Sequence, residues 1–212
     1  MYYNRGMKKI LVYDCDGVLF HSEKAIIGYY DFIFEKFNLP AIDWSVEENL
    51  RLAMMNTSRE IIETFTKDDQ ISEEMLHFAA NTNFRKFLPL MEPAPNIFET
   101  LKKLQSEGYT LTVCTNRGIS LEYLLEYFDM GNFFAYTIST LDVAKPKPDP
   151  EGLYKIMEKY QVTNKDLLFI GDSFTDYYAA KAADVPFVAY ENRLEESPVM
   201  KDHLEIFDYL VD

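Results

Sequence analysis

KKILVYDCDGVLFHSE, which spans Lys8 to Glu23, is the stretch that decides the fold. Its apolar run ends at Asp14, a second carboxylate follows at Asp16, and Gly17 then allows a sharp turn. Two neighbouring carboxylates repel each other, so the pKa of one of them must rise, and an ordinary loop does not need both. The pair therefore indicates either a shared cation or a division of roles between a nucleophile and an acid/base.

The apolar run belongs to a repeated pattern of strands and helices. The sequence contains several short segments that are apolar on both faces and rich in Ile, Leu, Val and Tyr. Segments of this kind are typical of buried parallel strands. Strand, helix, strand, helix in alternation predicts a doubly wound α/β sheet. The predicted strands span 8–14, 109–115, 134–140, 166–172 and 185–190, and the predicted helices between them span 118–128, 150–160 and 175–183.

Polar residues stand where these strands end. The first strand ends in Asp14, the second in Thr115 and Asn116, and the fourth in Asp172. Ligands bind outside the carboxyl ends of the strands in an open parallel sheet. We therefore expect these side chains, although far apart in sequence, to meet at one edge of the sheet.

The gap between the first two strands is too long for a simple crossover connection. It contains four helical patterns, and Ser58 and Ser72 are placed as N-caps of the last two. Its many aromatic residues are expected to form the core of a small helical bundle rather than an apolar substrate pocket. The predicted organisation is an α/β core made of residues 1–20 and 90–212 and an inserted helical domain made of residues 21–89.

Composition limits the partners and the compartment. Because 21 basic residues face 35 acidic ones, the net charge is −14, which disfavours binding to nucleic acid or to an acidic membrane surface. We find neither an apolar run of about 18 residues, the length of a membrane-spanning helix, nor an export signal. The two cysteines, Cys15 and Cys114, are expected to be reduced core thiols. We expect a cytoplasmic monomer or homodimer.

Four motifs, taken together, resemble those of the haloacid dehalogenase superfamily. They appear in the family's order and on the expected strands, and the helical insert lies where the family's helical cap is found. The chain is similar to the branch of phosphoglycolate phosphatase and β-phosphoglucomutase, which implies a Rossmannoid parallel-sheet core with an inserted α-helical cap domain. The motifs are DCDGV (Asp14–Val18), TNR (Thr115–Arg117), KPKPDP (Lys145–Pro150) and GDSFTD (Gly171–Asp176).

The resemblance implies a role for each acidic residue. Asp14 would be the nucleophile that accepts a phosphoryl group, and the Asp16 side chain would protonate the leaving group and then deprotonate water. Mg²⁺ would be held by Asp14, by the backbone carbonyl of Asp16 and by Asp172. Asp176 would be a supporting residue that orients a metal-bound water or the lysine; alternatively, it is an ordinary acid at a helix start.

The resemblance also implies how the phosphate is bound. The Thr115 hydroxyl would donate to a phosphate oxygen, with the backbone or side chain of Asn116 assisting, and Lys145 would neutralise charge in the transition state. Lys147 is a rival because it also precedes a proline, but the pattern K-P-x-P-x-P begins at Lys145, which is therefore chosen. Arg117 could meet the phosphate or be a solvated arginine at a helix start.

In the predicted cap, MNTSRE (Met55–Glu60) resembles the GxSRE pattern of the β-phosphoglucomutase branch, with Asn56 in place of the glycine. Arg59 is accordingly the candidate for binding the distal part of a substrate, although an exposed surface arginine is an equal alternative. The three histidines, which include His203, show neither ligand spacing nor triad spacing.

These observations lead to one main functional hypothesis and two alternatives. The main one is a Mg²⁺-dependent phosphatase that acts on a small phosphorylated metabolite through an aspartyl phosphate. A phosphomutase of the β-phosphoglucomutase type would share the same core residues. A non-catalytic phospho-aspartate switch is disfavoured by the large insert and by the GDSFTD motif.

Overall fold

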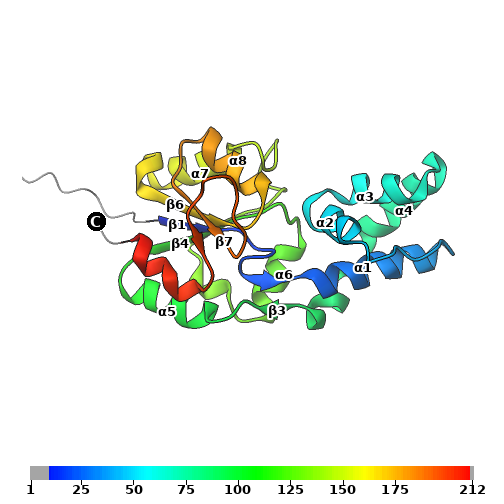
Figure 1. Ribbon diagram of the computed structural model, residues 1–212, viewed down its shortest axis with the longest axis horizontal. Coiled ribbons are helices and arrows are strands. Elements are labelled where there is room, and N and C mark those ends of the chain that lie inside the picture. The colour runs from blue at the N-terminus through cyan, green and yellow to red at the C-terminus, as the bar shows by residue number, and fades with distance from the viewer. Residues whose placement is uncertain (1–9, 211–212) are drawn as a thin grey trace, which may run out of the picture. The chain divides into compact units, whose positions relative to one another are not determined.

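The computed structural model describes residues 10–210 and divides the chain into two compact units (Figure 1). Within the described residues, one unit takes in 10–20 and 93–210, and the other spans His21–Glu92. The chain crosses between them in two short strands that pair with each other, β2 (Phe20–His21) and β3 (Glu92–Pro93). The return crossing thus lies three residues beyond the predicted end of the insert at residue 89.

The first unit is built on a six-stranded sheet in the order β5-β4-β1-β6-β7-β8. All neighbouring strands are parallel, so the predicted α/β fold is confirmed. Strand β1 lies in the interior of the sheet, where Tyr13 is in register with Val113 on one side and with Ile170 on the other. The strands are β1 (Ile10–Tyr13), β4 (Thr110–Cys114), β5 (Tyr136–Ile138), β6 (Leu167–Gly171), β7 (Phe187–Tyr190) and β8 (Val199–Met200).

Helices cover the two faces of this sheet. Side chains alternate along a strand, and Ile10 and Val12 share one buried cluster with residues of α7 and α8. In Figure 1, α7 and α8 lie on one side of the strands, and α5 and the C-terminal helix η4 lie on the other. The elements are α5 (Ile97–Ser106), α6 (Ser120–Tyr127), α7 (Glu151–Tyr160) and α8 (Phe174–Ala182), with the 3-10 helices η2 (Gly131–Phe133), η3 (Asn164–Asp166) and η4 (His203–Tyr209).

The second unit is helical, and its aromatic residues contribute to its own core, as in the buried cluster that contains Tyr30 and Phe34. Two of its N-caps differ from the prediction, because Thr57 caps α3 in a capping box with Glu60, and Asp68 caps α4.

Among residues 10–210, no helix has both the length and the apolar character needed to cross a bilayer. The helices are α1 (Glu23–Lys36), α2 (Glu47–Met55), α3 (Ser58–Thr66), α4 (Asp69–Asn81) and the 3-10 helix η1 (Phe84–Leu90).

Candidate active site

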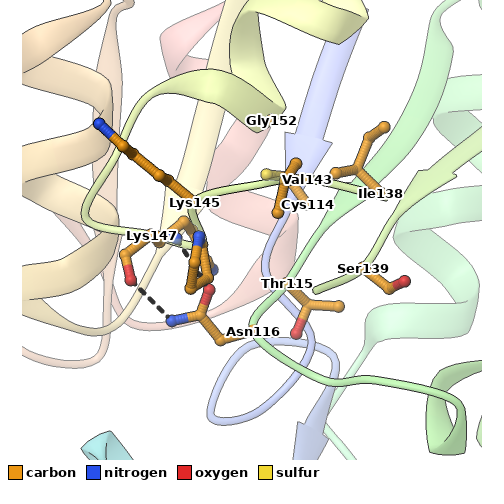
Figure 2. Close-up of a pocket in the computed structure, with 10 residues that line it drawn as sticks. Cys114, Thr115, Asn116, Ile138, Ser139, Val143, Lys145, Lys147 and Gly152 are labelled. Carbon is orange, nitrogen blue, oxygen red and sulfur yellow. Dashed lines mark hydrogen bonds between the residues drawn. The ribbon is translucent and has the colours of Figure 1, made fainter. Parts of the chain in front are cut away.

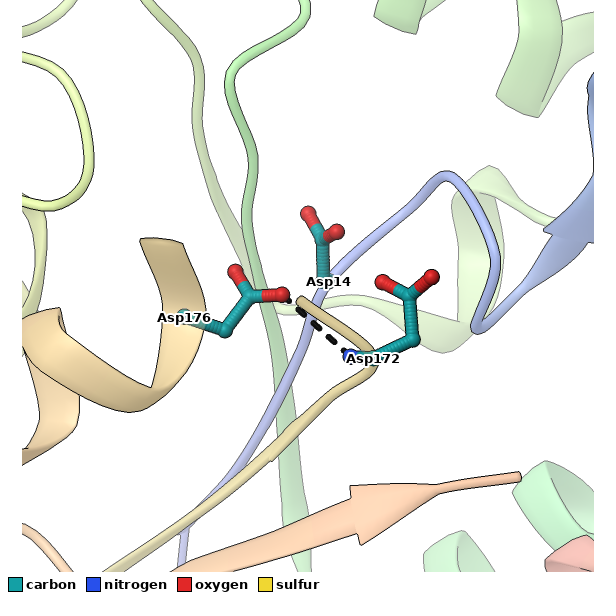
Figure 3. A group of neighbouring side chains, drawn as sticks. All are labelled: Asp14, Asp172 and Asp176. Carbon is teal, nitrogen blue, oxygen red and sulfur yellow. Dashed lines mark hydrogen bonds between the residues drawn. The ribbon is translucent and has the colours of Figure 1, made fainter. Parts of the chain in front are cut away.

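Three carboxylates meet at the carboxyl edge of the sheet. Asp14 follows β1 directly and is buried. Asp172 follows β6, and Asp176 lies in the first turn of α8. Each offers an oxygen within 4.8 Å of oxygens of the other two (Figure 3). The structure thus brings together Asp14 and Asp172, which end the first and the fourth predicted strands.

Lys147 is the cation of this cluster. Its Nζ donates to Asp14 Oδ1 at 2.7 Å and to Asp176 Oδ1 at 2.5 Å, and only 4 % of its side chain is exposed. The prediction that Lys145 occupies this place is wrong. The side chain of Lys145 is 75 % exposed, and its Nζ lies 4.0 Å from a carboxylate oxygen of Asp149.

Contacts of the loop backbone explain why Lys147 and not Lys145 enters the site. The Asn116 side chain accepts from the backbone N–H of Lys147 at 3.0 Å and donates to its carbonyl at 2.9 Å, which binds this residue to the end of β4. The backbone N–H of Lys145 instead donates to Glu151 in α7. In Figure 2 the Lys145 side chain points away from Thr115 and Asn116.

The phosphate-binding candidates lie at the end of β4. Thr115 is buried, and its Oγ1 accepts from the backbone N–H of Arg117 at 3.1 Å. Thr115, Asn116 and Lys147 all line a small pocket with about 190 Å³ of space between atoms, part of it open to solvent (Figure 2). Because the side-chain amide of Asn116 is bound to Lys147, the backbone N–H of Asn116 is a better candidate than its side chain for a contact with phosphate.

Asp16 has a partner that the sequence did not identify. Arg117 donates to both of its carboxylate oxygens, from Nε at 2.7 Å and from Nη2 at 2.6 Å. Only 8 % of the Arg117 side chain is exposed, so the alternative of a solvated arginine is wrong. No sequence signal reveals the contact, because the two residues are 101 positions apart and meet only when β1 and β4 pair.

Gly17 allows the carboxylate of Asp172 to approach the loop after β1. Its φ is +74°, and a Cβ built on it would lie 2.0 Å from Asp172 Oδ2. A side chain at this position would therefore displace the carboxylate as well as strain the backbone. Gly17 thus does more than permit a turn, because it also makes room for a candidate metal ligand.

Both proposed roles of Asp176 find support in its contacts. Its Oδ2 accepts from the backbone N–H of Ser173 at 3.2 Å, as expected of the N3 residue in a capping box, and from the Ser173 hydroxyl at 2.6 Å. Its Oδ1 accepts from Lys147. Asp176 therefore holds the helix start and orients the lysine, which is Lys147 rather than Lys145.

The electrostatics of the cluster reflect burial and repulsion. Burial raises the pKa of Asp14 to about 7, with a further increase from the charge of Asp176, while Lys147 opposes both effects. The pKa of Asp172 is also raised well above its ordinary value by burial, then by Asp176 and Asp14. Burial by itself would lower the pKa of Lys147, but its two carboxylate partners more than offset this, so it remains a cation.

The donor set fits a divalent metal. The carboxylates of Asp14, Asp172 and Asp176 lie within reach of one ion, and Lys147 pairs with two of them, Asp14 and Asp176. A hard divalent cation would neutralise the remaining negative charge, and such cations prefer carboxylate and carbonyl oxygens. Asp14 and Asp172 have the most suitable side chains, because both Asp176 oxygens already accept hydrogen bonds.

The C-terminal segment also contacts the loop after β1. His203 Nε2 lies 2.8 Å from the carbonyl oxygen of Val18, so this nitrogen carries the proton and donates. The ring is fully buried and stacks on Tyr190 with a centroid distance of 4.2 Å. His203 was not identified from the sequence because its partner is a backbone carbonyl 185 positions away.

Arg59, the predicted specificity residue, belongs to the helical unit. Its Nη1 donates to Glu63 at 3.0 Å and to Glu73 at 2.7 Å, and 55 % of its side chain is exposed. These contacts join α3 to α4 on the surface of the unit. They agree with an exposed surface arginine and leave its role toward a substrate as a prediction.

The chain matches known proteins along most of its length. The sequence profile of the haloacid dehalogenase-like hydrolases matches residues 11–190. A pyrophosphatase PpaX from Oceanobacillus iheyensis is 25 % identical over 206 residues, which are 96 % of this chain and 92 % of that protein. A phosphoglycolate phosphatase from Escherichia coli K12 is 29 % identical over 199 residues, covering 84 % of this chain and 79 % of that protein.

A solved structure agrees with these relatives. A HAD-superfamily hydrolase of subfamily IA, variant 1, from Geobacter sulfurreducens has a TM-score of 0.83 and 34 % identity, with all of both chains covered. The prediction of a phosphatase enzyme is confirmed at the level of its class by the names of the sequence relatives. On the evidence of the four motifs, the parallel sheet, the carboxylates at its edge and the profile match, this chain belongs to the haloacid dehalogenase-like hydrolases.

Proposed function

We propose that this chain is a Mg²⁺-dependent phosphatase that hydrolyses a small phosphorylated metabolite through an aspartyl phosphate on Asp14. The observation that carries the proposal is the Asp14 carboxylate, which is buried at the end of β1 with Lys147 Nζ 2.7 Å from its Oδ1. A carboxylate attacks a phosphate dianion only when the charge of both is neutralised, and a fixed buried cation contributes to that.

The first step joins an Asp14 oxygen to phosphorus and breaks the bond between phosphorus and the leaving oxygen. The cation of Lys147 would offset charge on the equatorial phosphate oxygens in the transition state. The Thr115 hydroxyl and the backbone N–H of Asn116 would donate to the same oxygens. Asp16 would give a proton to the leaving oxygen and, in the second step, take one from water.

The metal would be held by Asp14 and Asp172 through their side chains and by Asp16 through its backbone carbonyl. When bound, Mg²⁺ would supply charge neutralisation for the approach of Asp14 to the phosphate. The close approach of the Asp14, Asp172 and Asp176 carboxylates and the raised pKa values of Asp14 and Asp172 support this assignment.

The substrate is proposed to be a small anion. The sequence relatives are named for phosphoglycolate and pyrophosphate chemistry, and both names refer to small phosphorylated compounds. Because the chain carries a net charge of −14, recognition of an anion must depend on local cations. We propose that the helical unit acts as a cap that selects the substrate, with Arg59 as the candidate for a charged substrate tail.

A screen of phosphorylated metabolites with Mg²⁺ tests the proposal. Phosphate release is expected from the wild type and is expected to fall at least about 10³-fold in Asp14→Asn, because the nucleophile is absent while the side-chain volume is kept. Circular dichroism spectra of the two proteins serve as the folding control. Retained Mg²⁺-dependent hydrolysis in Asp14→Asn would exclude the mechanism, and an isomerised product without phosphate release would favour the phosphomutase.

A further inference from the structure

The contact between Arg117 and Asp16 is a planar two-point ion pair within the active site. Its two N–H···O distances are 2.7 and 2.6 Å, and the exposed side-chain fractions are 8 % for Arg117 and 21 % for Asp16. A paired geometry of this kind fixes the orientation of a carboxylate more strictly than a single contact does. The helical unit offers a control, because Arg51 makes the same two-point contact with Glu48 at 2.8 and 2.6 Å but is 58 % exposed.

The Arg117 side chain and backbone are themselves held in place. Its Nη1 donates to the Ser120 hydroxyl at 3.2 Å, at the start of α6. Its carbonyl accepts from the backbone N–H of Thr140 at 2.9 Å, beyond the end of β5. Its own N–H donates to Thr115. The guanidinium is thus a fixed part of the sheet edge rather than a mobile surface group. Through the two-point contact it also fixes the orientation of the Asp16 carboxylate.

The direction of these hydrogen bonds suits the ionised form of Asp16, which is the form that takes a proton from water in the second step. A guanidinium only donates, so each Asp16 oxygen in the pair is an acceptor. A carboxylate oxygen has two lone pairs, so an oxygen that accepts from the guanidinium is still able to accept a proton. The pair therefore holds Asp16 in the orientation and hydrogen-bonding role of a proton acceptor.

We propose that Arg117 is a positioning residue that holds Asp16 for the hydrolysis of phosphorylated Asp14. This inference rests on the proposed function. In this step a water oxygen bonds to phosphorus, the bond between phosphorus and the Asp14 oxygen breaks, and the water proton passes to Asp16. The products are free Asp14 and orthophosphate, and the proton later returns to solvent.

The test measures the two chemical steps separately in the full chain. A rapid-mixing experiment with 4-nitrophenyl phosphate and Mg²⁺ reports nitrophenol release in the first turnover, and acid quenching with mass spectrometry reports phosphorylated Asp14. In Arg117→Lys, which keeps the charge but loses the two-point geometry, decay of the phosphorylated enzyme is expected to slow about 10- to 100-fold. The first release of nitrophenol should change less than about threefold, since this acidic leaving group needs little protonation.

Four further variants complete the test. Asp16→Asn should slow the decay at least as much, and Arg117→Lys should then add little to it, as expected of two residues that act through one contact. Ser120→Ala removes only the contact to Nη1 and should slow the decay by a smaller factor. Arg51→Lys should change neither step.

The outcomes separate the two claims. If the phosphorylated form decays equally fast in wild type and in both Arg117→Lys and Ser120→Ala, the positioning role is excluded while the phosphatase proposal stands. The same holds if both steps slow equally in these variants, which indicates a merely structural effect. If the wild type forms no phosphorylated Asp14 and releases no phosphate from any compound screened, the proposed function itself fails.

Discussion

Lys147 and Arg59 each bridge two carboxylates, and they belong to different compact units. In the α/β unit, Lys147 lies between Asp14 and Asp176 at 2.7 and 2.5 Å. In the helical unit, Arg59 lies between Glu63 and Glu73 at 3.0 and 2.7 Å. The distances are similar, yet 4 % of the Lys147 side chain is exposed against 55 % of Arg59.

The difference in burial decides what each cation does. Around Arg59, water and salt screen the charges, so an exposed pair contributes little to stability. Around Lys147, water is excluded, and each charge depends on its partners because unpaired buried charges are costly. Judged by distance alone, the ion pairs of Lys147 and Arg59 look equivalent. Their difference in burial identifies Lys147 as a candidate catalytic group and Arg59 as a surface contact.

The largest expected difference comes from removing the two lysines of the KPKPDP motif one at a time. Lys147→Met keeps the apolar part of the side chain but leaves Asp14 and Asp176 without their cation. We expect kcat/KM to fall about 10²- to 10³-fold and the free energy of unfolding to fall by about 3–5 kcal/mol. Phosphate release and urea denaturation measure these changes.

Lys145→Met is the matched control, since Lys145 stands two positions away in the same motif and is exposed. It should keep both kcat/KM and unfolding free energy close to the wild-type values. If Lys145→Met lost as much activity as Lys147→Met, the assignment of Lys147 as the catalytic lysine would have to be abandoned.

A smaller effect is expected when pH is varied without metal. The Asp14 carboxyl has a pKa of about 7 in the folded chain, against an ordinary value of 3.8, mainly because it is buried. Between these values the unfolded chain holds fewer protons than the folded one, so the stability of the wild type should fall as pH rises. Asp14→Asn lacks this group, and its Tm relative to wild type should rise by several degrees from pH 4 to pH 7.

Scanning calorimetry in a chelating buffer measures the difference in Tm between the two proteins at each pH. Because both contain the remaining titratable groups, the comparison isolates position 14 and its electrostatic coupling to its charged neighbours, of which Asp176 and Lys147 have the largest effects. A difference that stayed constant, or that fell with pH, would contradict the raised pKa of Asp14.

The smallest effect is expected at the exposed cluster. Arg59→Ala should leave Tm nearly unchanged, since screened surface contacts contribute little. If Arg59 binds a charged substrate tail, kcat/KM should fall about 10-fold for such a substrate and less than about twofold for an aryl phosphate. Arg51→Ala, which removes another exposed arginine of this unit, is the control, and equal losses on both substrates would exclude Arg59 from specificity.

Much of the α/β unit could be predicted from the sequence because the end of a buried strand is marked by the change from an apolar run to a polar residue. Asp14, Thr115 and Asp172 each close an apolar run, and parallel strands place their carboxyl ends along one edge. Their convergence therefore required no knowledge of side-chain contacts. The general position of the helical insert could be predicted for a similar reason, because its length excludes a simple crossover.

The remaining features depend on contacts that a linear pattern does not encode. Lys145 and Lys147 both precede a proline, and backbone contacts distinguish them, since Asn116 binds the Lys147 backbone and Glu151 binds that of Lys145. The pairing of Arg117 with Asp16 requires two strands to be in register. The start of α3 was displaced by one residue because two neighbouring hydroxyl residues, Thr57 and Ser58, compete for the N-cap, whereas α4 begins earlier than predicted because Asp68 caps it.

The interior position of β1 has a consequence for the order in which the protein takes shape during synthesis. Residues 10–13 leave the ribosome early, but their two partner strands, β4 and β6, begin only at residues 110 and 167. Residues 21–92, which are contiguous, can meanwhile form the helical unit. The loop that carries the nucleophile also needs His203 for its contact at Val18, so a nascent chain should remain catalytically silent until residue 203 has left the ribosome.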